Sequence, residues 1–224
     1  MTTVVIPVYD EVTQLDFTAP HQFLTLVPDI TVIVASIGGA PVKTGGLVFD
    51  QLADLDTIEQ CDVLLVPGGL GCINAMENPQ YLSAVQRLAK TATYITSVCS
   101  GSIILGAAGL LTGRRAASHW AWLDLLRAFG AVPEKARVVR DGNLITGGGV
   151  TAGADFALTL ISELRDEDTA QCVQLALEYD PQPPFDAGNA DTAPTHIRYM
   201  TIDQMGKLMG DARQRVEAFA GRGR

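Results

Sequence analysis

The chain has 224 residues, of which 47% are hydrophobic, so it can bury one large core or two small ones. Its formal net charge is −9, from 16 Lys and Arg against 25 Asp and Glu, with no basic block interleaved with aromatic residues. This balance argues against nucleic acid as a partner. The longest apolar run is far shorter than the roughly 20 residues that a membrane-spanning helix needs.

The N-terminus and the cysteines bear on the cellular compartment. The first ten residues, MTTVVIPVYD, lack the cationic flank and the long apolar stretch of a secretory signal. The four cysteines show neither the paired CxxC spacing of a zinc site nor the density of a disulfide scaffold. We therefore expect a cytoplasmic protein with reduced cysteines, in which Cys61 and Cys172 are core or interface residues and Cys72 is unassigned.

Apolar, β-rich runs alternate with helix-like segments along the first 130 residues. The predicted strands are 3–9, 31–36, 63–67 and 94–98, and the predicted helices are 18–27, 79–92, 101–110 and 120–129. Asn78 is a suitable N-cap for the second helix, and Pro79 suits its first position. This alternation is typical of a parallel sheet covered by helices on both faces, so we expect a doubly wound α/β sandwich.

The second part of the chain adds a hairpin and a C-terminal extension. Residues 136–147, ARVVRDGNLITG, place Asp-Gly-Asn between two β-rich runs, which predicts a β-hairpin. Residues 147–167 run from three glycines into a long amphipathic helix. Residues 179–194 are too rich in Pro for a regular element, so we expect an ordered surface wrap followed by a short charged helix. The absence of repeats and linkers predicts one domain over 1–224, with the wrap from about 179.

Three segments that follow predicted strands carry residues able to do chemistry. Ligands of open α/β sheets bind beyond the carboxyl ends of the strands. Asp16 follows the first strand and comes just before the helix predicted at 18–27. The sequence PGGLG, at 67–71, follows the strand at 63–67, and Cys99 follows the strand at 94–98. We expect these three segments to converge.

Cys99 is the candidate nucleophile. At the start of the helix predicted at 101–110, unpaired backbone N–H groups and the positive end of the helix dipole favour a thiolate over a thiol. The alternative is a small buried hydrophobic residue, which is the commoner role of a free cysteine. Ser100 either caps the same helix or also holds a water molecule.

Asp16 and the PGGLG segment also have two interpretations each. Asp16 is either a cap or turn residue, or a proton carrier that meets Cys99 across the crevice when the first strand lies near the centre of the sheet. The glycines form a tight turn, which also offers backbone N–H groups to a developing anion. The N–H groups of Gly69 and Leu70 are the candidates for that role.

The chain has three histidines, at positions 21, 119 and 196, so a mechanism that uses a Cys–His pair is easy to check. His119 is followed by Trp120 and lies at the predicted end of a strand. We interpret His119 as a pocket-wall or hydrogen-bonding residue and not as the general base.

With these motifs in place, the chain resembles the ThiJ/PfpI superfamily, whose flavodoxin-like fold is similar to that of class I glutamine amidotransferases. The resemblance covers nearly the whole length. Longer stretches resemble the isocyanide hydratase branch: QLDFTAPHQFL, VPGGLG, TSVCSGSIILGAAGLLTGRRAASHWAW, RVVRDGNLITGGGVTAGADFALTL and PPFDAGNADTAP.

The family's catalytic pattern is a nucleophilic cysteine, an aspartate after the first strand and a threonine after the cysteine. It corresponds to Cys99, Asp16 and Ser100, where serine keeps the hydroxyl and loses the methyl group. The resemblance implies that a homodimer hydrates a small neutral isocyanide to the formamide through a cysteine thioimidate, with no metal or cofactor. The residues expected to line the substrate site are Gly69, Leu70, His119 and Trp120.

The chain lacks the residues that related activities in this superfamily require. A glutamine amidotransferase needs a late His-x-Glu, whereas His196 is followed by Ile and Arg, and a PfpI-type peptidase has His directly after the cysteine, where this chain has Ser100. Glyoxalase and deglycase relatives use Glu after the first strand, and regulators with this fold carry a helix-turn-helix domain for which 224 residues leave no room. The open alternative is a redox sensor, in which Cys99 is oxidised to a sulfinic acid stabilised by Asp16 and no substrate is turned over.

Overall fold

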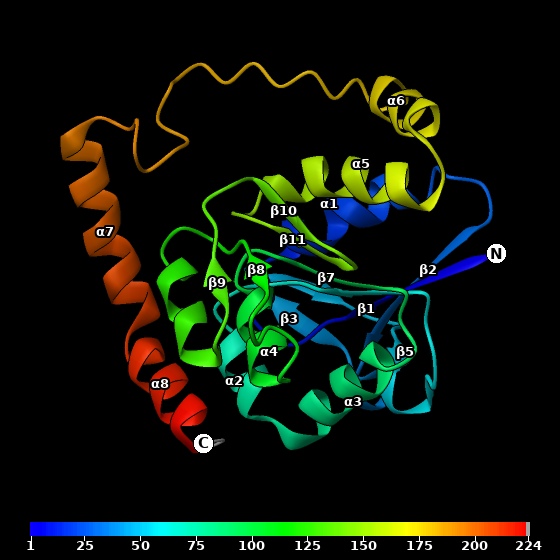
Figure 1. Cartoon of the computed structure of the whole chain (residues 1–224), viewed down its shortest axis with the longest axis horizontal. Helices are drawn as coiled ribbons and strands as arrows, with labels where there is room; N and C mark the ends of the chain where they lie inside the picture. Colours follow the sequence, from blue (N-terminus) through cyan, green and yellow to red (C-terminus); the bar gives the residue numbers. More distant parts are fainter. Residues whose placement is uncertain (223–224) are drawn as a thin grey trace.

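The computed structural model of the chain describes residues 1–222. Its centre is a seven-stranded sheet with the strand order β10-β11-β7-β6-β1-β2-β5 (Figure 1). The strands are β1 (Thr2–Pro7), β2 (Ile30–Ser36), β5 (Ala53–Asp54), β6 (Val63–Val66), β7 (Tyr94–Val98), β10 (Val138–Asp141) and β11 (Leu144–Gly147). Neighbouring strands are parallel except in the β10–β11 hairpin, which is antiparallel. The predicted fold class and the added hairpin are therefore confirmed.

Helices cover both faces of this sheet (Figure 1). One face carries α1 (Gln14–Leu24) and α5 (Ala152–Leu164), with α6 (Glu167–Ala176) packed on α5. The other face carries α2 (Cys72–Glu77), α3 (Pro79–Ala89) and α4 (Gly101–Ala107). Within the described part of the chain, no helix is long and apolar enough to cross a bilayer.

Short elements connect these layers. The small sheets are the antiparallel pair β3 (Val42–Thr44) and β4 (Leu47–Phe49), and the parallel pair β8 (Arg115–Ala116) and β9 (Val132–Pro133). The 3-10 helices are η1 (Ile37–Gly39), η2 (Leu55–Thr57) and η3 (Leu123–Phe129). The last two helices are α7 (Thr195–Met209) and α8 (Ala212–Arg222), and α8 packs against α2, α4 and η3.

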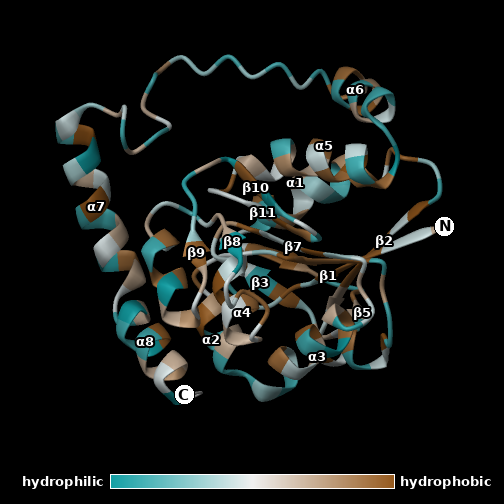
Figure 2. Ribbon diagram, viewed as in Figure 1, coloured by the Kyte–Doolittle hydropathy of each residue, from teal (hydrophilic) through white to brown (hydrophobic). Residues whose placement is uncertain are grey.

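The central strands lie in the core because helices exclude water from both of their faces. All four residues of β6 are fully buried, and Figure 2 shows the inner strands as a continuous hydrophobic layer. Such strands read as unbroken apolar runs in the sequence. β1 lies inside the sheet, between β6 and β2, so its carboxyl end opens beside the ends of β6 and β7. This arrangement brings the three segments singled out above to the same edge of the sheet.

Two predicted helices differ from the structure. The first begins at Gln14, so that Asp16 lies within its first turn and not before it. The helix predicted at 120–129 is instead the 3-10 helix η3, at Leu123–Phe129. A 3-10 helix repeats every three residues, which places the buried side chains of Trp122 and Leu125 on one side.

The prediction for the C-terminal region was wrong in one respect. Two helices of 15 and 11 residues, α7 and α8, follow the Pro-rich segment, where one short helix was expected. Gly210 separates them with φ of 51°, a left-handed conformation that interrupts the helical path. The Pro-rich segment itself is mostly exposed and forms an arc from α6 to α7 (Figure 1), which contacts the body through an ion pair between Asp191 and Lys135 and through the cavity beside Trp120.

Candidate active site

Cys99 lies on the sharp turn between β7 and α4, as predicted. Its φ is 61°, in the left-handed region that residues with a Cβ atom rarely adopt. Hydrogen bonds hold this conformation. The Cys99 N–H donates to the carbonyls of Gly147 (3.2 Å) and Gly148 (2.8 Å), and its own carbonyl accepts from the hydroxyls of Ser102 (3.2 Å) and Ser118 (3.0 Å). Hydrogen bonds to both its N–H and its carbonyl therefore fix the strained backbone of Cys99.

The glycines around this turn allow two backbones to approach closely. A Cβ on Gly101 would lie 2.1 Å from the carbonyl oxygen of Val66, and one on Gly68 would lie 2.5 Å from the backbone nitrogen of Ser100. Both distances are far shorter than any real Cβ contact. The glycines after β6 and at the start of α4 thus let the PGGLG loop lie directly against the Cys99 turn.

Asp16 is completely buried beside this loop. Its Oδ2 atom accepts a hydrogen bond from the Gly68 N–H at 3.0 Å. Among the described residues, its Oδ1 atom has no N–H or O–H donor, and the side chain that interacts with the carboxyl group is the thiol of Cys99. The structure therefore brings together the two residues that the sequence places at the ends of separate strands.

Burial dominates the electrostatics of this pair. Desolvation raises the pKa of Asp16 to about 7, although the hydrogen bonds from Cys99 and Gly68 lower it. Desolvation also raises the pKa of Cys99 well above its usual value, and the negative charge of Asp16 adds to that effect. A hydrogen bond from the Ser100 N–H lowers the pKa of Cys99 but offsets this rise only in part. Burial thus opposes the thiolate that the start of α4 is expected to favour.

The close interaction makes thiol and carboxyl group a coupled pair. When one proton remains on the pair, it lies either on Cys99, facing the Asp16 carboxylate, or on Asp16, facing the Cys99 thiolate. Each state leaves one charge stabilised by a hydrogen bond from its partner. A pair of this kind can supply a nucleophile and a proton from the same place.

Ser100 joins the glycine loop to the Cys99 turn. Its hydroxyl accepts a hydrogen bond from the Gly69 N–H (3.0 Å) and donates to the Gly69 carbonyl (3.1 Å), so it is directed to the loop instead of capping α4. The Gly69 N–H is therefore already engaged. Within residues 1–222, the Leu70 N–H has no protein acceptor, and the Leu70 side chain is exposed. Of the two candidate donors to a developing anion, Leu70 is the one with a free N–H in this structure.

His119 lies next to Ser118, whose hydroxyl holds the Cys99 carbonyl. Its Nδ1 atom accepts a hydrogen bond from the Ala121 N–H at 3.3 Å, which leaves the proton of the neutral ring on Nε2. Desolvation lowers its pKa, so the ring is neutral at pH 7. A Cβ on Gly149 would meet the ring at 3.3 Å. His119 is thus a half-buried hydrogen-bond donor near the turn, consistent with the role of a pocket-wall residue.

Trp120 faces the C-terminal extension. Its ring lies 5.5 Å from that of His119, and it lines a small cavity of about 60 Å³ together with the arc between α6 and α7. The residues on the other side of this cavity include Ala187, Ala190 and Ile197. The structure therefore connects the His119–Trp120 segment with a part of the chain that the sequence had not linked to it.

Two residues near the pair were not assigned from the sequence. Cys72 begins α2, is fully buried and interacts with the Ser100 hydroxyl. Desolvation raises its pKa to about 12, so it is a neutral thiol that fills space beside the site. Ser118 donates a hydrogen bond from its hydroxyl to the Cys99 carbonyl and so supports the Cys99 turn. Its only signal in the sequence was a small polar residue next to His119.

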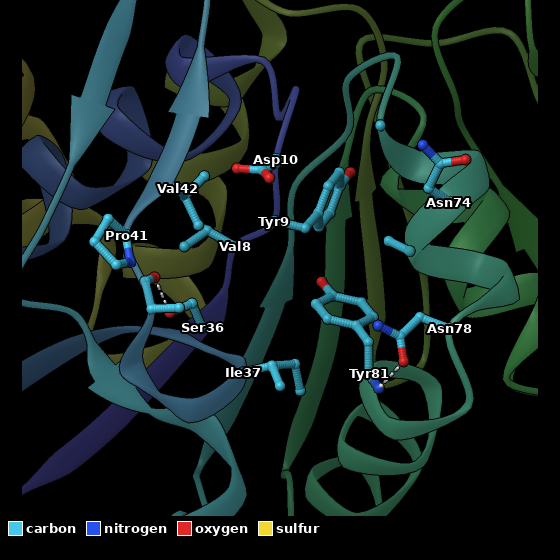
Figure 3. Close-up of a pocket in the computed structure, with 13 residues that line it drawn as sticks. Val8, Tyr9, Asp10, Ser36, Ile37, Pro41, Val42, Asn74, Asn78 and Tyr81 are labelled. Atoms are coloured by element: carbon cyan, nitrogen blue, oxygen red, sulfur yellow. Dashed lines mark hydrogen bonds between the residues drawn. The ribbon is translucent and has the colours of Figure 1, made fainter.

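A larger cavity, of about 340 Å³, lies at the carboxyl ends of β1 and β2 (Figure 3). Tyr9 and Tyr81 form one wall, with their rings edge to face at 5.4 Å, and Asp10 lies at the rim. The Tyr9 hydroxyl donates to the carbonyl of Pro67 at 2.7 Å, at the start of the glycine loop. Cys99 and Asp16 lie outside the lining of this cavity. Because Cys99 is only 5% exposed, the pair itself admits a small molecule at most.

Among residues 1–222, no three His, Cys, Asp or Glu side chains are close enough together to hold a metal ion.

Known proteins resemble this chain over most of its length. Residues 2–163 match the model of the DJ-1/PfpI family. The chain is 53% identical over 193 residues to isonitrile hydratase from Pseudomonas putida, which covers 84% of this chain and 83% of that protein.

Solved structures agree with this relationship. A ThiJ/PfpI family protein from Pseudomonas syringae has a TM-score of 0.92 and 42% identity, and the match covers 98% of this chain and 90% of that one. DJ-1beta of Drosophila melanogaster has a TM-score of 0.70 and 26% identity, covering 79% and 97% of the two chains. A cysteine on a strained turn and a family match that spans the whole central sheet lead to one conclusion: the chain belongs to the DJ-1/PfpI family.

Proposed function

We propose that the protein hydrates a small neutral isocyanide, R–NC, to the N-substituted formamide, R–NH–CHO. The observation that carries this proposal is the buried pair of Cys99 and Asp16, in which a nucleophile and a proton carrier share one position. The 53% identity to an isonitrile hydratase supports the choice of substrate.

The first step forms a covalent intermediate. The sulfur of Cys99 bonds to the terminal carbon of the isocyanide, and the proton of the pair passes from Asp16 to the same carbon. The product is a thioimidate, R–N=CH–S–Cys99. Because sulfur and proton arrive at one atom, the two groups must lie on the same side of a small site, as the interaction between Cys99 and Asp16 allows.

The second step consumes water. Asp16, now a carboxylate, takes one proton from a water molecule, whose oxygen adds to the thioimidate carbon, and the second proton of the water passes to the nitrogen. Collapse of the tetrahedral intermediate breaks the carbon–sulfur bond and expels the thiolate. The carbon keeps the water oxygen as the carbonyl of the formamide, and the proton taken by Asp16 restores the pair. Ser100 keeps the glycine loop in place and is the family's third catalytic position.

The substrate site is small and carries no net charge of its own apart from the pair. We assign its lining to Gly69, Leu70, His119 and Trp120. In this assignment the free N–H of Leu70 and the Nε2–H of His119 are the donors available to the polarised nitrogen or oxygen. The single domain, the homodimer, the cytoplasmic location and the lack of a nucleic-acid partner belong to the same proposal.

The test is ultraviolet absorbance of the purified, reduced protein with an aryl isocyanide, following the formation of the formamide. We expect saturable turnover that is lost in Cys99→Ala. The matched control is Cys172→Ala, which removes an exposed thiol on α6 and should leave turnover unchanged.

Failure of the reaction would favour the redox alternative. If the reduced protein does not turn over the isocyanide, and peroxide adds two oxygen atoms to Cys99 by mass, the hydratase proposal is wrong. Turnover that persists in Cys99→Ala would exclude the covalent mechanism while leaving hydration itself established.

A further inference from the structure

We propose that Tyr9 is a positioning residue for the reaction: its hydroxyl holds the peptide group between Pro67 and Gly68, and this peptide group in turn holds the carboxylate of Asp16. Tyr9 lies two residues after the end of β1, on the wall of the larger cavity (Figure 3). Its role rests on the function proposed above, in which Asp16 carries the proton.

One peptide group is bound at both of its ends. The Tyr9 hydroxyl donates to the carbonyl oxygen of Pro67 at 2.7 Å, and the Gly68 N–H donates to Oδ2 of Asp16 at 3.0 Å. That carbonyl and that N–H belong to the same planar peptide unit. A donor at the carbonyl end polarises the peptide group and strengthens its N–H as a donor. The hydroxyl of Tyr9 therefore fixes both the direction and the strength of the hydrogen bond that reaches Asp16.

Tyr9 keeps its proton at every pH that matters for the reaction. The residue is only 9% exposed, and burial raises its pKa well above the ordinary value of a phenol. A neutral phenol with this carbonyl as its acceptor is a permanent donor. The hydrogen bond to Pro67 thus acts in the same way whether or not the buried pair has lost a proton.

The glycine loop has other anchors that do not depend on Tyr9. The carbonyl of Gly68 accepts a hydrogen bond from the Thr13 N–H at 2.9 Å, and the Ser100 hydroxyl binds both the N–H and the carbonyl of Gly69. These bonds keep the loop in place when the Tyr9 hydroxyl is removed. The peptide group before Gly68 is what loses its orientation and polarisation.

The carboxylate of Asp16 has few groups that stabilise it against burial. They are the thiol of Cys99 and the Gly68 N–H. The titratable groups that interact with Asp16 come from three elements of the site: Cys99, Cys72 and Tyr9. Because the pKa of Cys72 is about 12 and that of Tyr9 is also raised, both stay neutral near pH 7. A weaker bond from Gly68 is therefore felt directly in the affinity of Asp16 for its proton.

The other elements that pack on α1 do not supply a competing charge. The acidic residues of α5 are Asp155 and Glu163, and they form ion pairs with Arg137 and Arg140. Strand β2, with the sequence ITVIVAS, contains no titratable residue.

Tyr81 provides a matched control inside the same cavity wall. It is 1% exposed, its ring packs edge to face on that of Tyr9, and its hydroxyl donates to the carbonyl of Pro7 at 2.9 Å (Figure 3). The peptide group that it holds ends in the Val8 N–H, which donates to the carbonyl of Ala35 in β2 at 2.8 Å. Removing this hydroxyl has a similar local cost, but it acts on the sheet and not on Asp16.

The first experiment compares Tyr9→Phe with Tyr81→Phe in the pH dependence of kcat/KM for an aryl isocyanide. A weaker hydrogen bond to the carboxylate raises the pKa of Asp16, so the acid limb of Tyr9→Phe should move up from about 7 by ~0.3 to 1 pH unit. Turnover at higher pH should stay close to that of the wild type. Tyr81→Phe should keep the wild-type midpoint. A loss of Tyr9→Phe activity that is equal at every pH, or the same shift in both variants, would overturn the proposal.

The second experiment follows the proton without turnover. The carboxyl carbon of Asp16 is observed by NMR in protein labelled with carbon-13 aspartate, and it is assigned as the signal that Asp16→Asn lacks. We expect its titration to move up in Tyr9→Phe and to stay in place in Tyr81→Phe. If the isocyanide is not turned over, the proposed function is wrong, yet this titration still decides the role of Tyr9. An unchanged Asp16 titration in Tyr9→Phe would overturn that role even in an active enzyme.

A third measurement keeps every hydrogen bond and covers the case in which Tyr9→Phe does not fold. Replacing tyrosine throughout by 3-fluorotyrosine makes the phenol more acidic and thus a stronger donor, and the cavity of about 340 Å³ beside the ring leaves room for fluorine. The Asp16 titration should then move down, opposite to the shift in Tyr9→Phe, and the same labelling of Tyr81→Phe should also move it down. An upward shift, or none, would contradict the proposal.

Discussion

Asp16 is a carboxyl group that the fold places out of reach of water, and this burial raises its pKa to about 7 from an ordinary value of 3.8. The thiol of Cys99 lies beside it and is also buried. The sequence could identify both residues, because each follows a strand of a parallel sheet. It could not give the direction of the thiol's pKa shift, because that shift depends on the desolvation created by α1 and the glycine loop.

The pH dependence of turnover follows from this pair. Below pH 7 both groups carry protons, so the pair has no nucleophilic thiolate; above pH 7 one proton remains, which is the reactive form. We expect kcat/KM for the isocyanide to rise with pH through about 7 and to fall only well above 9, the ordinary thiol value, where the last proton is lost. A profile that falls between pH 6 and 8 would contradict this assignment of protons.

Replacing Asp16 by Asn should lower the turnover of the enzyme and raise its stability above pH 7. We expect turnover at least ~100-fold lower, because Asn cannot carry the proton. An acid whose pKa is raised on folding binds a proton more tightly in the folded state, so the wild type loses stability as pH rises from 3.8 to about 7. The Asn side chain does not ionise, so the variant does not lose this stability.

The measurement is urea unfolding at pH 8 and at pH 4. At pH 8 the Asp16→Asn variant should be more stable than the wild type by about 1 to 4 kcal/mol, and the difference should shrink at pH 4. Asp168→Asn, which removes an exposed carboxylate at the start of α6, is the control that should change neither quantity. A variant that is less stable at pH 8 would show that the carboxylate is compensated by contacts other than those described.

At the scale of elements, the site depends on close contact between the loop after β6 and the start of α4. Gly101→Ala should destabilise the protein by about 3 kcal/mol, since its Cβ would lie 2.1 Å from a backbone oxygen of β6 that cannot move freely. Gly206→Ala is the matched control. It lies in α7 with open space around it, so the change should be neutral or slightly stabilising. Thermal unfolding of both variants checks the prediction, and equal effects would contradict it.

The boundaries of elements were predicted less well than their order. Strand 94–98 and the β10–β11 hairpin were correct because an apolar run and an Asp-Gly-Asn turn are strong local signals. The first helix was placed four residues late. Pro20 lies well inside α1, where it cannot donate to the carbonyl of Asp16 four residues earlier. Tertiary packing of Phe17, Phe23 and Leu24 outweighs that local cost.

At the scale of the whole molecule, the fold class was predictable and the course of residues 179–209 was not. The alternation of strands and helices is enough to predict a doubly wound sheet even where the boundaries of elements are misplaced. Residues 179–209 lack that regularity, and their position follows from contacts at their two ends, at Tyr179 and α8.

The proposed homodimer predicts that stability depends on protein concentration. We expect the melting temperature of the wild type to rise when the protein concentration is increased, because binding of a second copy to the folded state favours folding by mass action. Differential scanning calorimetry over a range of concentrations tests this, and a constant melting temperature would argue for a monomer.

The contact between Trp120 and the C-terminal extension has a consequence for evolution. Trp120 is assigned to the proposed substrate site, and the cavity that it lines also includes Ala187, Ala190 and Ile197. Cys99 and Asp16 are buried within the core. Substitutions in the extension can therefore alter the substrate preference of such an enzyme and leave the two reacting groups unchanged.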